Sequence, residues 1–129
     1  MGLTENEVAK QIVDAAYQIH TSLGPGLLES AYEAVLGYEL EKRGLHIIRQ
    51  QAIPIIYQGV RIETGFRADL VVEEKVIVEI KTVETILPIH KKQLLTHLRL
   101  AEKHLGLLIN FNVMLIKDGI TRIANGLRD

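Results

Sequence analysis

The sequence contains no cysteine. This absence excludes a disulfide framework and any metal site built from thiolates, and it makes a cytoplasmic location the default expectation. No run approaches the roughly 18 apolar residues of a membrane span, and the first residues lack a cationic segment followed by an apolar one. We therefore expect neither export nor a membrane partner. The formal net charge of −1 gives no overall attraction for nucleic acid, so such a partner would require a local basic patch or a metal.

The size and balance of the chain fit one folded unit. Its 129 residues are 47% hydrophobic and 24% charged, which is enough apolar material for a real core but too little chain for two cores. We expect a single domain over residues 1–129.

Hydrophobic periodicity and turn signals predict helices and strands in a mixed order. Thr4 and Glu7 form a capping-box pattern at the start of the first helix, and Pro88 is tolerated in the first turn of the last one. The outcome is an α/β fold in which helices cover a mixed β-sheet. We expect helices at 4–23, 27–43 and 85–104, extended chain at 46–63 with a turn at 58–59, a hairpin at 68–81, strands at 107–111 and 113–116, and a turn at 117–119 leading into a strand at 120–123.

The hairpin at 68–81 carries three charges in otherwise apolar strands. If the loop is the polar segment 73–75, Val72 pairs with Val76 and, by the same count, Asp69 pairs with Glu79. The two carboxylates would then lie on one face, with Cβ atoms about 5 Å apart. Side chains alternate along a strand, so Lys81 falls on the face of Glu79. These three residues form the candidate site.

Two interpretations of this cluster are open. Two close carboxylates repel unless a positive group lies between them, and a divalent cation with oxygen ligands, Mg²⁺ or Mn²⁺, would supply it. A lysine beside such a metal could orient water or stabilise a developing negative charge. The alternative is a structural ion-pair cluster with no ligand.

A motif near the N-terminus resembles a known family. The pattern Gly26-x-x-Glu29-x-x-Tyr32 is similar to the signature of the GxxExxY proteins, which are grouped with the PD-(D/E)XK nuclease superfamily, and the similarity extends over nearly the whole chain. Ala68 stands where the name-giving proline would be. The resemblance implies a restriction-endonuclease-like core, a mixed β-sheet flanked by α-helices.

The resemblance also implies roles for individual residues. Asp69, Glu79, the main-chain carbonyl of Ile80 and Glu29 match metal ligands, and Lys81 matches the lysine of the superfamily; Asp69, Glu79, Lys81 and Glu29 are thus the candidate catalytic residues. Candidate substrate-binding residues are Gln93, Tyr32 and His97, with His97 in place of a tyrosine.

Plainer explanations remain open for several of these residues. Glu29 could simply be an acid favoured at a helix start. Tyr32 could be a packing aromatic whose hydroxyl bonds a neighbour. The histidines at 90, 97 and 104 share a helical face, which is more typical of a solvated surface than of a metal site.

Two functions follow from the sequence. The first is a metal-dependent nuclease that hydrolyses phosphodiester bonds of nucleic acid, DNA being favoured over RNA. The second is a catalytically silent module that binds nucleic acid or protein on a nuclease fold. A homodimer would enlarge the contact surface in either case.

Overall fold

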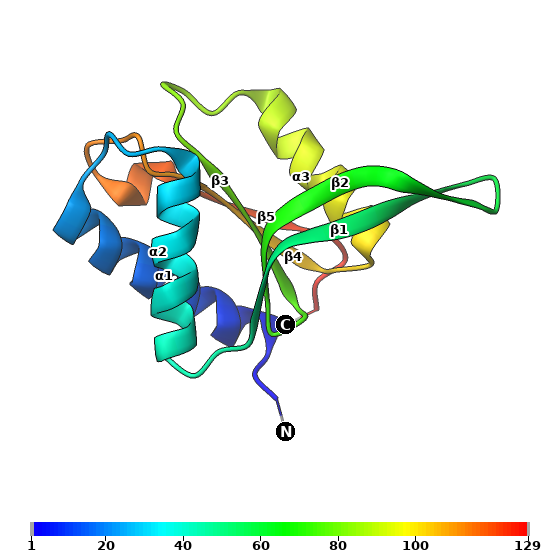
Figure 1. The fold of residues 1–129 in the computed structure, drawn as a ribbon, viewed down its shortest axis with the longest axis horizontal. Coiled ribbons are helices and arrows are strands. Elements are labelled where there is room, and N and C mark those ends of the chain that lie inside the picture. Colours follow the sequence, from blue (N-terminus) through cyan, green and yellow to red (C-terminus); the bar gives the residue numbers. More distant parts are fainter. Residues whose placement is uncertain (1, 129) are drawn as a thin grey trace.

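A computed structural model describes residues 2–128, apart from the side chain of residue 64. Two helices precede a long hairpin, and a third helix connects the next two strands (Figure 1). None of the helices in this described part is long and apolar enough to cross a membrane. The elements are α1 (Glu5–Leu23), α2 (Glu29–Lys42), β1 (Ile47–Tyr57), β2 (Val60–Val72), β3 (Val76–Lys81), α3 (Pro88–Ala101), β4 (Leu105–Asn110), the 3₁₀-helix η1 (Ile116–Gly119) and β5 (Ile120–Ala124).

The helix signals in the sequence are confirmed. Thr4 caps α1, because its side chain accepts a hydrogen bond from the Glu7 N–H while the Glu7 side chain bonds back to the Thr4 N–H. Pro88 is the first residue of α3, where its missing N–H would have had no helical partner.

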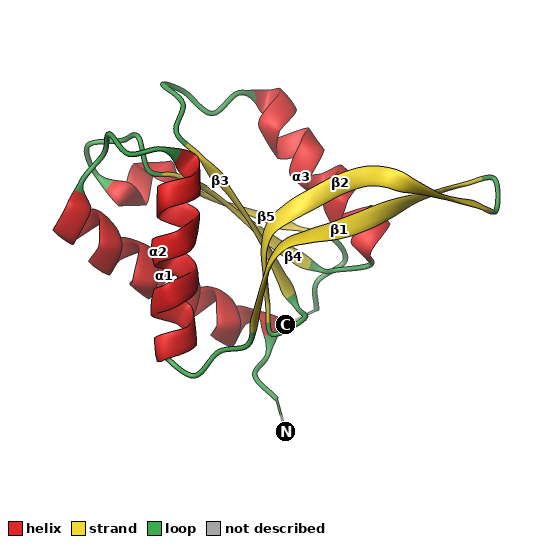
Figure 2. Cartoon of the chain, in the orientation of Figure 1, coloured by secondary structure: helices red, strands yellow, loops and turns green. Residues whose placement is uncertain are grey.

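The strands form one five-stranded sheet in the order β1-β2-β3-β4-β5. The β3–β4 pair is parallel and the other pairs are antiparallel. Parallel neighbours require a crossover connection, and α3 provides it. The expected mixed sheet flanked by helices is therefore confirmed (Figure 2).

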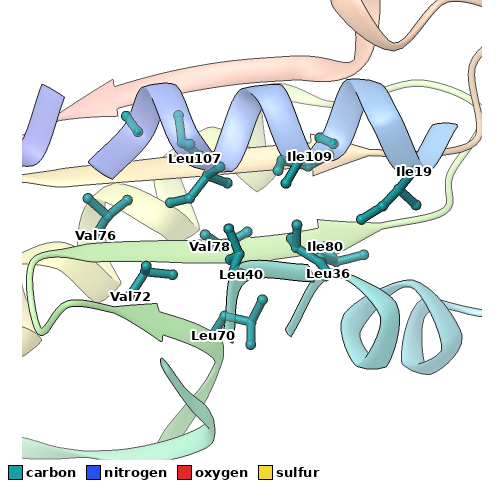
Figure 3. Packing of buried hydrophobic residues seen from close by; sticks show 14 of the residues in the cluster. Ile19, Leu36, Leu40, Leu70, Val72, Val76, Val78, Ile80, Leu107 and Ile109 are labelled. Atoms are coloured by element: carbon teal, nitrogen blue, oxygen red, sulfur yellow. The ribbon is translucent and has the colours of Figure 1, made fainter. Parts of the chain in front are cut away.

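Helices cover both faces of this sheet. On one face, α1 and α2 pack against alternate residues of β2, β3 and β4, and Figure 3 shows Leu36 and Leu40 of α2 meeting the sheet at Val78 and Ile80. On the opposite face, Leu94 and Leu98 of α3 pack against the residues in between. Each central strand therefore buries both of its faces.

The register of the β2–β3 hairpin is the predicted one from Val72 opposite Val76 to Leu70 opposite Val78. The ladder ends there, and the predicted pair Asp69–Glu79 is not part of it. Because Val78 and Ile80 belong to the core under α1 and α2, strand alternation directs Glu79 and Lys81 toward the face that α3 covers. In β2 the alternation breaks at Asp69, since Ala68 packs under α3 whereas Leu70 packs under α1 and α2.

The outer part of the β1–β2 hairpin extends beyond the sheet as a two-stranded ribbon (Figure 1). The register shifts between Ile53 and Ile55, so β2 carries a bulge there. A Cβ added at Gly65 would lie 1.9 Å from the carbonyl oxygen of Ile53. Only glycine lets the two backbones approach this closely.

The prediction of a strand at 113–116 is wrong. This segment connects β4 to η1 without pairing, and Met114 is 89% exposed. Both edges of β4 are already occupied, by β3 and by β5. The apolar run therefore has no strand to pair with, and Ile116 alone of its four residues is buried in the core.

Replacing Gly65 with alanine should destabilise the protein. The added methyl group must displace the Ile53 carbonyl, and forced overpacking of this kind costs about 1–3 kcal/mol. Urea unfolding followed by circular dichroism measures the loss. Gly59→Asn in the turn of the same hairpin is the control, because Gly59 has φ 77° with nothing near its Cβ position, and asparagine tolerates positive φ. Equal stability of Gly65→Ala and wild type would contradict the bulge.

Candidate functional site

Asp69 lies where the β2 and β3 backbones stop pairing. Beyond the Leu70–Val78 pair, the Ile80 N–H donates to Asp69 Oδ2 at 2.8 Å. The carboxylate thus takes the place of a main-chain acceptor, and it ties the two strands together at the position that the sequence predicted for the site.

The charge on Asp69 is held in an unfavourable environment. Burial raises the pKa of this carboxyl group, and the nearby carboxylates of Glu33 and Glu79 raise it further. The hydrogen bonds from Ile80 and Gln50 act in the opposite direction. A cation beside Asp69 would lower the free-energy cost of ionising this carboxyl group, because an opposite charge favours the ionised form.

Glu79 is buried, at 7% exposure, and is held by α3. His97 Nδ1 contacts Glu79 Oε2. The imidazole in turn stacks on Phe66 of β2, with ring centroids 3.6 Å apart and planes 11° from parallel. His97 therefore orients Glu79, and the predicted contact of His97 with substrate stays a prediction.

Lys81, the last residue of β3, is the third residue of the predicted site. Its carbonyl oxygen accepts a hydrogen bond from the Phe111 N–H at 3.1 Å, which fixes the backbone. Its side chain is partly exposed. Within the described residues the ammonium group makes neither an ion pair nor a hydrogen bond, so it is available to an incoming anion.

Glu29 reaches the end of β3 from the first turn of α2. Its Oε2 accepts a hydrogen bond from the Thr82 N–H at 3.0 Å, one residue beyond Lys81. The next residue, Val83, is held by Asn110, which accepts from its N–H at 3.1 Å and donates to its carbonyl at 2.8 Å. Glu29 and Asn110 together fix the chain that follows Lys81.

Sequence reasoning assigned no role to Asn110. Asn110 is the last residue of the buried strand β4, and it is 2% exposed. A polar residue directly after a run of apolar strand residues was the available signal, since a buried amide must find partners.

A second acid, Glu33, was also missed. It is 6% exposed and forms an ion pair with Arg49 at 3.0 Å. Gln50 Nε2 donates both to Glu33 and, at 3.3 Å, to Asp69 Oδ1. The spacing from Glu29 to Glu33 is one helical turn, which places both acids on the same side of α2 and could have revealed the second.

Among the described residues, neither Tyr32 nor Gln93 forms a hydrogen bond with Asp69, Glu79 or Lys81. Tyr32 is fully buried and stacks on Phe111 with ring centroids 4.3 Å apart. Its hydroxyl donates to the Gly24 carbonyl at 2.6 Å and accepts from the Leu27 N–H at 3.2 Å. This placement matches the packing interpretation of Tyr32, because a fully buried ring offers a substrate no surface. Gln93 is exposed on α3.

The oxygen donors of the site suit a hard cation. In the described part of the chain, no three His, Asp or Glu side chains form a group that could hold a metal ion by themselves. Mg²⁺ does not need such a group, since it keeps several waters and commonly binds one or two carboxylates together with substrate phosphates. Asp69 and Glu79 are oxygen donors of this kind, and burial, together with the neighbouring carboxylates, raises the pKa of Asp69.

Comparison with protein families matches residues 6–123 to the PD-(D/E)XK nuclease superfamily. Comparisons with curated proteins and with solved structures returned no match. The matched region runs from α1 into β5, and its mixed sheet flanked by three helices is a restriction-endonuclease-like α/β fold. The chain belongs to the PD-(D/E)XK nuclease superfamily.

Proposed function

We propose that this protein is a nuclease of the GxxExxY group that hydrolyses phosphodiester bonds with the help of Mg²⁺ or Mn²⁺, and that DNA is its preferred substrate. The observation that supports this most is the arrangement around Asp69. A carboxylate with a raised pKa is held against the Ile80 N–H and beside Glu79. Two residues beyond Glu79, the Lys81 ammonium group has no partner among the described residues. Nuclease chemistry uses each of these groups.

Asp69 and Glu79 are the residues that would hold the cation, with the Ile80 carbonyl as a further oxygen donor. When bound, a divalent cation polarises a phosphoryl oxygen and lowers the pKa of coordinated water. The His97 contact fixes the Glu79 carboxylate in one orientation, so that less conformational freedom is lost when a ligand binds.

Lys81 would act on the phosphate. Its ammonium group can orient the attacking water or stabilise the negative charge that develops on the phosphorane. Glu29 and Asn110 are suited to a supporting role, because they hold the residues directly after Lys81 and so fix where its side chain begins.

Exposed basic side chains near the site could bind the phosphate backbone. Arg67 precedes Asp69 by two residues in β2 and is exposed, and Lys91 and Lys92 are exposed on α3. They offer local positive charge in a chain whose net charge is −1, and the resulting binding should weaken with salt.

The second candidate is a binding module without turnover. The His97 contact favours it, because an imidazole on Glu79 Oε2 occupies one oxygen of a proposed metal ligand. Metal binding and cleavage distinguish the two candidates.

Mn²⁺ should stabilise the wild-type protein but not Asp69→Asn. At a concentration of 100 times Kd, a ligand that binds only the folded state adds about 2.7 kcal/mol, which thermal unfolding detects as a rise in Tm. The substituted amide would keep an oxygen for the Ile80 N–H but would lack the charge that attracts the cation. An equal Mn²⁺ effect on both proteins would refute Asp69 as a ligand.

In metal-free buffer at pH 7, Asp69→Asn should melt at a higher temperature than wild type. The pKa of Asp69 is raised by folding, so its ionisation costs stability progressively as pH rises above the ordinary value of 3.8. Below that value Asp69 is protonated in both the folded and the unfolded state, and the advantage of the amide should disappear. The check is Tm against pH in the presence of EDTA.

Lys81→Ala should impair turnover far more than binding. An interaction that strengthens only in the transition state lowers kcat when it is lost, by about 10²-fold for one preorganised electrostatic group. Cleavage of labelled DNA and RNA with Mg²⁺ gives kcat, and fluorescence anisotropy gives Kd, which should change by only a few fold.

Lys10→Ala is the matched control, because it removes an exposed lysine of α1, which covers the face of the sheet opposite α3. It should leave kcat and the salt slope of binding unchanged. Purified wild type that binds nucleic acid but cuts neither DNA nor RNA with Mg²⁺ or Mn²⁺ would support the binding module instead.

A further inference from the structure

Gln50 combines an unusual backbone with an unusual pair of contacts. Its φ is 54°, in the left-handed region, although it lies inside β1. The other non-glycine residues with positive φ in the described chain lie in turns or at a helix end. A residue held in this region costs free energy and persists only where its surroundings enforce it. Here the Arg67 guanidinium donates to the Gln50 carbonyl oxygen at 3.0 Å.

This backbone places the side chain of Gln50 between two carboxylates. The strand register puts Gln50 across from Asp69, between the pairs Arg49–Leu70 and Gln51–Ala68. The Nε2 amide group donates to Asp69 Oδ1 at 3.3 Å and also to Glu33 Oε1. A primary amide has two hydrogens, so one group can serve both acids.

Glu33 provides a fixed anchor for this bridge. Its carboxylate is nearly buried, and Arg49 holds its other oxygen at 3.0 Å. With Gln50 bonded to this anchored acid, the second hydrogen of the amide is directed at Asp69. Asp69 is then held through both oxygens, Oδ1 by Gln50 and Oδ2 by the Ile80 N–H at 2.8 Å.

We propose that Gln50 is a positioning residue, which uses the anchored Glu33 to hold the Asp69 carboxylate in the orientation that the site requires. The inference rests on the proposed function for its effect on catalysis, but its structural part does not. A neutral amide suits the task, because it separates two carboxylates without adding charge. Each Asp69 oxygen retains a further lone pair for a cation, since an ionised carboxylate can accept about four hydrogen bonds.

Gln50→Gly is the most informative variant. Glycine adopts positive φ without strain, so the backbone conformation of β1 should be kept while the bridge is lost. We expect kcat to fall by about 10- to 100-fold, the usual effect of removing a group that orients a metal ligand. Mn²⁺ affinity, measured by thermal shift, should fall by about 10-fold, and KM for DNA should stay within a few fold.

Gln58→Gly is the matched control. Gln58 is the same residue type with a φ of 50°, but it lies in the exposed turn of the ribbon. It should leave kcat and Mn²⁺ affinity unchanged. Gln50→Glu, which keeps the shape but places a third carboxylate between the other two, should lower kcat and Mn²⁺ affinity at least as much as Gln50→Gly.

Crystal structures of wild type and Gln50→Gly separate this inference from the proposed function. The Asp69 carboxylate should turn or become disordered in the variant while Glu33 keeps its contact with Arg49. That result supports positioning even if wild type proves to lack nuclease activity. An unchanged Asp69 conformation in Gln50→Gly, or wild-type kcat and Mn²⁺ affinity in an active protein, would overturn the inference.

Discussion

The candidate site depends on the hydrogen bond between the Ile80 N–H and Asp69 Oδ2. It forms at the place where β2 and β3 cease to pair through their backbones, so one carboxylate both completes the hairpin and marks its end. A buried N–H without an acceptor would be costly, and Asp69 satisfies it. The same placement partly buries the Asp69 carboxyl group, and burial together with two neighbouring acids raises its pKa.

The groups around this charge come from every layer of the fold. His97 reaches Glu79 from α3, Glu29 and Glu33 come from α2, and Gln50 lies on β1. Asn110, at the end of β4, fixes the chain beyond Lys81. The order of the sheet brings these elements together, because α2 and α3 cover opposite faces of the strands that carry the acids.

Local sequence patterns predicted most helices and strands correctly, but they did not predict which elements and side chains contact one another. The polar segment 73–75 between two apolar runs identified the hairpin and its register, and the Thr4 capping box identified the start of α1. The apolar run at 113–116 was misread, because whether such a run becomes a strand depends on a free neighbouring edge, and β4 has none. Tyr32 occupies a motif position, yet its ring packs against Phe111 in the core.

The sequence by itself determined that Asp69, Glu79 and Lys81 lie at the far end of one hairpin, because a short polar loop between two apolar strands fixes the register from Val72–Val76 to Leu70–Val78. Only the tertiary structure decided what surrounds them. The contacts of Gln50, Glu33, His97 and Asn110 described above join residues between 16 and 27 positions apart, and no local period encodes such pairs. They arise because burying the apolar faces of three helices against one sheet leaves the polar side chains at its rim with few partners other than one another.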